Sequence, residues 1–177
     1  MPTRRGAAGR SGPAPWARAD FGASSGGPMG RLDADAPRTD EATHGNTDRV
    51  LTVLVIDDEG SIRTAIRLGL EDAGHAVLEA ANGRDGLDMM QAATGPLVVS
   101  LDLMMPVMSG VELLHAVGRD ADLAARLAFV ICTGAHEFPV RDLARYLARG
   151  RLSVVEKPFD IDTLVAAIEA AGQRLVG

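Results

Sequence analysis

Five polar side chains in this sequence follow short apolar runs of the kind that form buried strands. They are Asp57, Asp58, Asp102, Thr133 and Lys157. Carboxylates are ligands for hard divalent cations, and a hydroxyl and an ammonium can hold the oxygens of an anion. If the fold brings these groups together, they form an oxygen-rich cation site next to a single amine.

The three acids favour a bound cation over a purely structural role. Like charges at contact range repel, and a divalent cation removes the conflict. With neither histidine nor cysteine beside Asp57, Asp58 and Asp102 in the sequence, the ligands are oxygen only, which favours Mg²⁺ over zinc or copper. Capping of the following helix is the alternative explanation, but it accounts for one acid and not for three acids on two strands.

Lys157 is the one lysine in a chain with 18 basic residues. Because every other residue of the 18 is arginine, we expect this position to need the compact charge of an ammonium group. Such a charge would stabilise the anionic oxygens of a phosphoryl group. The hydroxyl of Thr133 could donate a hydrogen bond to a phosphoryl oxygen. The next residue, Gly134, has no side chain, so the backbone there could approach the phosphoryl group closely.

The apolar pattern alternates between strand-like and helix-like spacing from residue 49 onward. Five strands alternating with five helices predict a doubly wound α/β fold with a parallel sheet, whose functional crevice lies at the carboxyl ends of the strands. The strands are expected over 51–56, 76–80, 97–102, 128–132 and 153–156, and the helices are expected to begin near 62, 83, 110, 140 and 160.

Composition divides the 177-residue chain into 1–48 and 49–177. The first segment holds eight of the 20 glycines and five of the nine prolines, and it has too little apolar surface to offset backbone entropy. We expect a disordered tail there, acting as a solvated linker or carrying a short partner motif around Trp16 and Phe21. Its balanced charge argues against a nucleic-acid arm.

The remaining counts exclude several protein classes. One cysteine excludes a disulfide-stapled scaffold, and no apolar run approaches the roughly 18 residues of a membrane span. Arg4 and Arg5 are not followed by the apolar segment of a secretory signal. A soluble, cytoplasmic protein is expected, with no membrane partner and no nucleic-acid partner.

Four motifs, in this order, resemble the receiver domain of two-component response regulators over about residues 50–176. They are Val-Ile-Asp57-Asp58-Glu, Leu-Asp102-Leu-Met-Met-Pro-Val-Met-Ser-Gly, Ile-Cys-Thr133-Gly and Val-Glu-Lys157-Pro-Phe. The resemblance implies a flavodoxin-like five-stranded parallel sheet of order 2-1-3-4-5, with helices on both faces.

The resemblance also implies a role for each motif residue. Asp102 would accept a phosphoryl group from a histidine kinase or phosphotransfer protein. Asp58, Asp102 and the backbone carbonyl of Met104 would bind Mg²⁺ directly, with Asp57 acting mainly through water. Lys157 would contact the phosphoryl oxygens, and Thr133 would move towards them.

Two further features of the Lys157 motif follow from the resemblance. The Lys157–Pro158 bond is expected to be cis. The family often carries an aromatic residue three positions before the lysine, and this chain has Val154 there. We therefore expect a switch that works without an aromatic side chain.

The leading hypothesis is a stand-alone signalling module, because no output module follows the last predicted helix. Such a module is a phosphoacceptor and not an enzyme, and it would act through protein–protein contacts with an unknown target. The alternative is a Mg²⁺-dependent phosphatase of the haloacid dehalogenase type, with Asp57 as nucleophile. That family expects an aspartate where this chain has Glu59.

Overall fold

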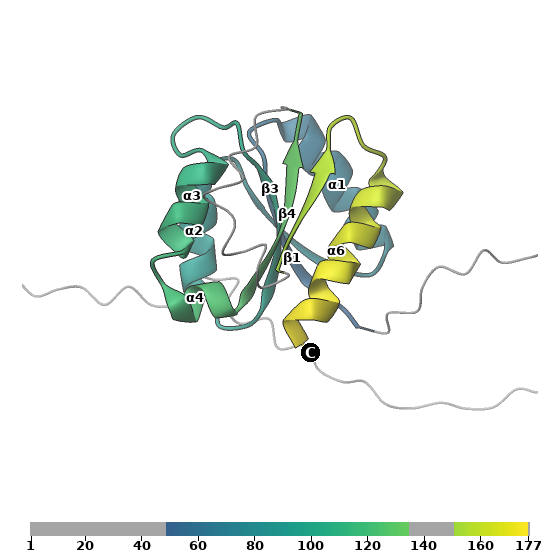
Figure 1. Ribbon diagram of the computed structural model, residues 1–177. Coiled ribbons are helices and arrows are strands. Elements are labelled where there is room, and N and C mark those ends of the chain that lie inside the picture. Colours follow the sequence, from purple (N-terminus) through teal and green to yellow (C-terminus); the bar gives the residue numbers. More distant parts are fainter. Residues whose placement is uncertain (1–48, 135–150, 177) are drawn as a thin grey trace, which may run out of the picture. The chain divides into compact units, whose positions relative to one another are not determined.

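The computed structural model describes residues 49–134 and 151–176, which belong to the second of the chain's two units, Thr47–Gly177. The five described strands form one parallel sheet in the order β2-β1-β3-β4-β5, which confirms the predicted fold class and strand order (Figure 1). Their bounds are β1 Thr52–Ile56, β2 Ala76–Ala80, β3 Leu97–Asp102, β4 Leu127–Thr133 and β5 Leu152–Glu156.

Helices cover both faces of the sheet. Helices α2, α3 and α4 lie on one face, and α1 and α6 lie on the other (Figure 1). Their bounds are α1 Gly60–Asp72, α2 Gly83–Ala92, α3 Gly110–Val117, α4 Ala121–Ala125 and α6 Ile161–Val176. The helix expected near 140–148 lies outside the described residues.

Helix α4 was missed in the sequence. It has five residues and buries only Leu123, so it is too short to show a helical apolar period. Its start is set by the Asp120 side chain, which accepts bonds from the backbone N–H groups of Asp122 and Leu123.

Side chains cap three other helices. Asn82 caps α2, Ser109 and Glu112 form a capping box on α3, and Asp160 accepts a bond from the Thr163 N–H at the start of α6. Helix α1 differs, because its N-cap residue Glu59 makes no such bond. The loop between β1 and α1 must therefore be held by other contacts.

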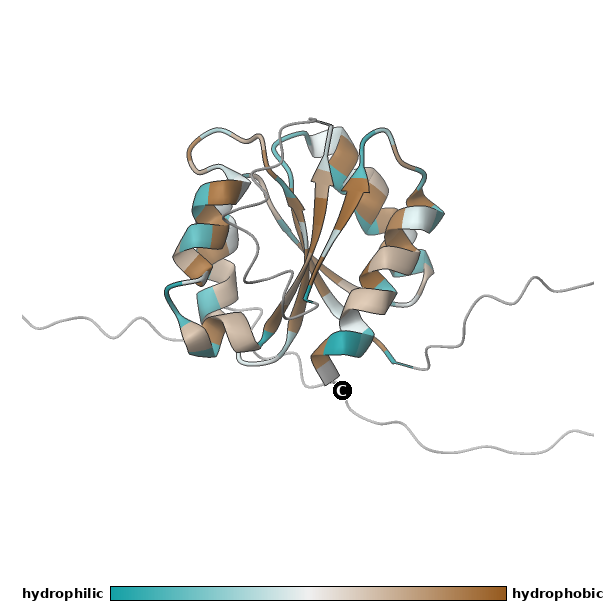
Figure 2. Cartoon of the chain, viewed as in Figure 1, coloured by the Kyte–Doolittle hydropathy of each residue, from teal (hydrophilic) through white to brown (hydrophobic). Residues whose placement is uncertain are grey.

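The sheet separates two apolar layers. Leu54, Ile56, Leu101 and Phe129 point to the α2–α3–α4 side, whereas their strand neighbours, such as Val55, pack against α1 and α6. Strands β3 and β4 are buried along their whole length, and β1 is buried except at its first residue. The apolar strands between partly polar helices are visible in Figure 2. This rigid sheet fixes the positions of the residues that follow its strands.

Candidate functional site

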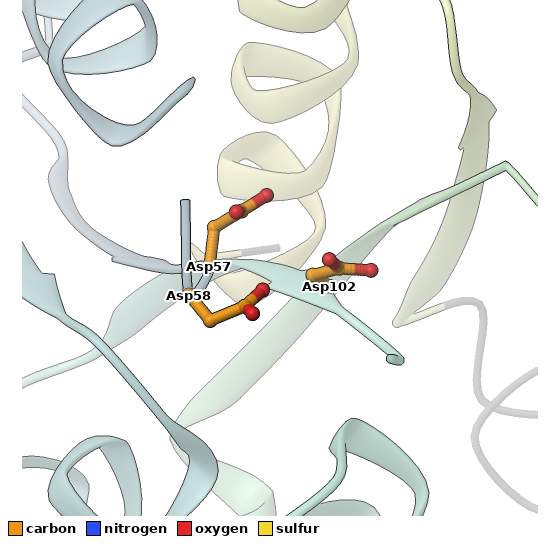
Figure 3. A group of neighbouring side chains, drawn as sticks. All are labelled: Asp57, Asp58 and Asp102. Atoms are coloured by element: carbon orange, nitrogen blue, oxygen red, sulfur yellow. The ribbon is translucent and has the colours of Figure 1, made fainter. Parts of the chain in front are cut away.

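Three carboxylates meet at the carboxyl edge of the sheet. Asp57 and Asp58 follow β1, and Asp102 is the last residue of the neighbouring strand β3. One carboxylate oxygen from each lies within 4.8 Å of the others (Figure 3). The pairing of β1 with β3 produces this cluster, because parallel strands end at one edge.

Lys157 joins two of these acids. Its Nζ atom donates to Asp57 Oδ2 at 2.8 Å and to Asp102 Oδ2 at 3.2 Å. Burial alone would lower the pKa of Lys157, but the two carboxylates outweigh it, and the pKa lies above its ordinary value. The amine therefore carries a positive charge at neutral pH, between the ends of β1 and β3.

The acidic cluster fits a divalent cation. With the three acids ionised, one ammonium leaves the cluster with two net negative charges. At a separation of 4.8 Å and an effective dielectric constant near 20, each pair of carboxylates repels by about 3.5 kcal/mol. Asp57 is buried and Asp58 is exposed, so an ion can reach the cluster from solvent. The donor atoms are all oxygens, as Mg²⁺ requires.

Met104 lies next to the cluster. Its backbone N–H donates to Asp102 Oδ1 at 3.3 Å, and its side chain is exposed. The predicted role of its carbonyl as a metal ligand stays a prediction.

Thr133 and Lys157 are neighbours through strands β4 and β5. Thr133 is buried at the end of β4, and its carbonyl oxygen accepts the Lys157 N–H at 2.9 Å. The Lys157–Pro158 peptide bond is cis, as expected. All five side chains singled out in the sequence therefore lie at one sheet edge.

Val154 occupies β5, the edge strand of the sheet, and its side chain is exposed. The resemblance would lead us to expect an aromatic residue here, but Val154 itself has no ring that could rotate inward.

Local turn contacts explain part of the geometry at Asp57, as they do at Asp102, where Oδ1 accepts the Met104 N–H. Asp57 Oδ1 accepts the Glu59 N–H at 2.9 Å, which is a turn contact. Its other oxygen is bound by Lys157. Asp57 therefore stabilises the turn with one carboxylate oxygen and binds Lys157 in the charged cluster with the other.

Two residues near the site escaped the sequence reasoning. Arg63 donates to the Asp57 backbone carbonyl at 2.7 Å. Cys132 pairs with Asp102 in the sheet register and lies 3.4 Å from the Ser100 hydroxyl. Burial raises the pKa of the Cys132 thiol to about 11, so it remains protonated. The only signal in the sequence was that Arg63 lies six positions after Asp57, in the first turn of α1.

A doubly wound parallel sheet with acids after its first and third strands and a lysine after its fifth defines a receiver-type α/β domain. The model of the response regulator receiver domain family matches residues 53–169. The chain therefore belongs to this family of two-component signalling proteins.

Curated relatives agree with this membership. The chain is 33% identical over 125 residues to the transcriptional regulatory protein FixJ of Rhizobium meliloti, covering 71% of this chain and 58% of FixJ. It is 35% identical to the uncharacterized transcriptional regulatory protein YkoG of Bacillus subtilis, covering 67% of this chain and 50% of YkoG. For protein PilH of Pseudomonas aeruginosa the identity is 30%, covering 67% of this chain and 94% of PilH. The chain thus spans about half the length of several relatives.

Solved structures give the same fold. Chemotaxis protein CheY4 of Vibrio cholerae matches with a TM-score of 0.59 and 30% identity, covering 70% of this chain and 99% of that chain. A CheY-like receiver from Methanospirillum hungatei matches with a TM-score of 0.60 and 26% identity, covering 71% of this chain and 98% of that chain.

The comparisons do not support the phosphatase alternative, because the matching family is the receiver domain. Within the described ranges, no helix has both the length and the apolar character needed to cross a bilayer.

Proposed function

We propose that the domain accepts a phosphoryl group on Asp102 from the phosphohistidine of a kinase or phosphotransfer protein, in a Mg²⁺-dependent reaction in the cytoplasm. The observation that carries the proposal is the Lys157 ammonium between Asp57 and Asp102, beside a third carboxylate. A receiver domain is a signalling module, so the only chemistry proposed is phosphorylation and dephosphorylation of its own aspartate.

In the proposed reaction, a carboxylate oxygen of Asp102 attacks the phosphorus atom. The new P–O bond forms as the P–N bond to the donor histidine breaks, and the imidazole keeps the electron pair of that bond. Lys157, already within 3.2 Å of Asp102 Oδ2, offsets negative charge on the phosphoryl oxygens. The Thr133 hydroxyl donates to one of those oxygens. Because Thr133 is the last residue of β4, this bond changes the conformation at the end of that strand when Asp102 is phosphorylated.

Asp58, Asp102 and the Met104 carbonyl are the proposed direct ligands of the magnesium ion, with Asp57 acting mainly through water. When bound, the ion supplies positive charge that offsets the phosphoryl oxygens. The buried Asp57 is anchored by the protein, whereas the exposed Asp58 faces solvent.

We further propose that the domain works through contacts with a target protein. The match to PilH over 94% of that protein supports a receiver that acts without an attached output domain. The coverage of 50% of YkoG and 58% of FixJ shows that other relatives carry additional chain.

The first prediction tests the acceptor. Asp102→Asn removes the nucleophilic carboxylate and is expected to abolish labelling by acetyl phosphate in Mg²⁺, followed by intact mass and peptide mapping. Asp88→Asn, an exposed aspartate on α2, is the matched control and is expected to be labelled like the wild type. Labelling that survives in Asp102→Asn, or a modified peptide containing Asp57 instead, would contradict the proposal.

A further inference from the structure

Every polar group of Asp57 has a partner. Its N–H donates to the Ala80 carbonyl, its Oδ1 accepts the Glu59 N–H, and its Oδ2 accepts Lys157. The remaining group, the backbone carbonyl, accepts Nη1 of Arg63 at 2.7 Å. Because Asp57 is only 2% exposed, water cannot easily replace a lost partner.

Arg63 is itself held in place. Its side chain is 20% exposed, and its Nε lies 3.7 Å from Oε1 of Glu79 on the edge strand β2. Arg67, one turn further along α1, binds the other oxygen of Glu79 at 3.2 Å. The planar guanidinium of Arg63 therefore spans from the edge strand to the loop between β1 and α1.

Among the helices that the structure describes, α1, which follows this loop, is the one without a side-chain N-cap bond. The N-cap residue Glu59 makes no capping bond with its side chain, whereas Asn82 and Ser109 cap α2 and α3. Asp57 and Asp58 both project from this loop. Two side-chain contacts hold its backbone in place of a cap: Arg63 on the Asp57 carbonyl, and Asp57 Oδ1 on the Glu59 N–H.

We propose that Arg63 is a positioning residue for the acidic cluster. By holding the Asp57 carbonyl, it fixes the backbone from which two of the three carboxylates project, and so it raises the affinity of the cluster for a divalent cation. This inference rests on the proposed function, since it assumes that the cluster binds Mg²⁺. Residues that orient metal ligands in this way strongly affect metal affinity in other proteins.

The charge of Arg63 and its positioning role have opposite effects on the affinity of the cluster for a cation. Removing a positive charge near an acidic site strengthens cation binding by electrostatics alone. Freeing the Asp57 carbonyl weakens binding, because the carboxylates must then be ordered when the ion binds. A loss of affinity on removing Arg63 therefore cannot come from its charge.

The experiment measures the Mg²⁺ dissociation constant of the full chain by titration calorimetry with magnesium chloride. Arg63→Met is expected to weaken binding about tenfold, the range seen when an orienting partner is lost. The matched control is Arg67→Met. This variant also removes one positive charge from α1 and one contact with Glu79, but Arg67 makes no contact with Asp57. It is expected to stay within about twofold of the wild type. Arg63→Lys keeps the charge and one donor, and it is expected to recover part of the loss.

Melting curves by circular dichroism show that each variant is folded at the titration temperature. If Arg63→Met does not fold, Glu79→Gln tests the same anchor, and a loss of about threefold is expected because Arg63 remains but is less constrained. Unchanged or tighter binding by Arg63→Met, or an equal loss in Arg67→Met, overturns the inference while the proposed function stands. If the wild type binds no Mg²⁺, both fail.

Discussion

A single ammonium group partly offsets the negative charge of the carboxylates at the ends of β1 and β3. Lys157 lies between Asp57 and Asp102, and its pKa is raised because these acids outweigh the effect of burial. A raised lysine pKa contributes stability that is fully present below the ordinary lysine pKa and is lost as pH rises through the folded-state value. Only strongly alkaline conditions therefore remove this contribution.

Replacing this lysine tests its role as counter-charge. Lys157→Met leaves the buried Asp57 without the donor to Oδ2, and in EDTA it is expected to lower the free energy of unfolding by about 1–3 kcal/mol. Saturating Mg²⁺ is expected to recover part of the loss, because the ion supplies the missing positive charge. Urea denaturation in EDTA and in Mg²⁺ measures both values.

Arg84→Met removes an exposed cation on α2 and serves as the control, with little change expected in either buffer. An equal loss for Lys157→Met with and without Mg²⁺ would show that the lysine contributes through packing alone.

At the scale of elements, the segment between β3 and α3 is pressed against the end of β3. A Cβ atom on Gly110 would lie 2.3 Å from the Asp102 carbonyl oxygen and 2.9 Å from the Leu103 Cα. The Gly110 N–H also donates to the Leu103 carbonyl at 3.1 Å. Only glycine lets the start of α3 approach the backbone of Asp102 this closely. The helix start therefore helps to place the carboxylate of Asp102, the proposed acceptor.

Gly110→Ala is expected to push α3 away from β3 and to lower the free energy of unfolding by about 1–3 kcal/mol. The phosphorylation rate with acetyl phosphate should also fall, because the overlap is with Asp102 itself. Gly95→Ala is the control, since a Cβ there meets nothing within 4 Å. Urea denaturation and a timed labelling assay measure the two effects. Wild-type stability and rate in Gly110→Ala would contradict this account.

At the scale of the whole molecule, one sheet with two apolar layers supports the entire site. Both layers are built from the described residues of the unit Thr47–Gly177. The residues of the acidic cluster and Lys157 belong to the same unit. We therefore predict that the domain after the boundary near residue 49 folds without the segment before it and shows the proposed Mg²⁺ binding by itself.

A chain of residues 47–177 is expected to melt within about 3 °C of the full chain, the shift that roughly 1 kcal/mol produces in a domain of this size. Its Mg²⁺ dissociation constant should match that of the full chain within about twofold, since no described cluster residue lies outside it. Calorimetric melting and titration of both chains check this. Aggregation, or a much lower melting temperature, would show that the first segment contributes to the fold.

The sequence determined the elements of the sheet and the residues that end them. Strands expected over 76–80 and 97–102 match β2 and β3, and the expected 128–132 is one residue short of β4 at each end. Apolar runs of this kind are local signals that a sequence shows directly. The strand order and the roles of Asp102 and Lys157 came from the family resemblance, and the order is confirmed. Helix α4 was missed because five residues show no period.

Only the tertiary structure decided which groups touch. Lys157 and Asp57 are 100 positions apart, yet their side chains meet at 2.8 Å because β1, β3, β4 and β5 lie side by side. The contact of Arg63 with a backbone carbonyl, and its link to Glu79 on β2, depend on how α1 packs across the edge of the sheet. A sequence shows which side chains are present at each strand end, but distances and directions between them arise from packing of segments that are remote along the chain.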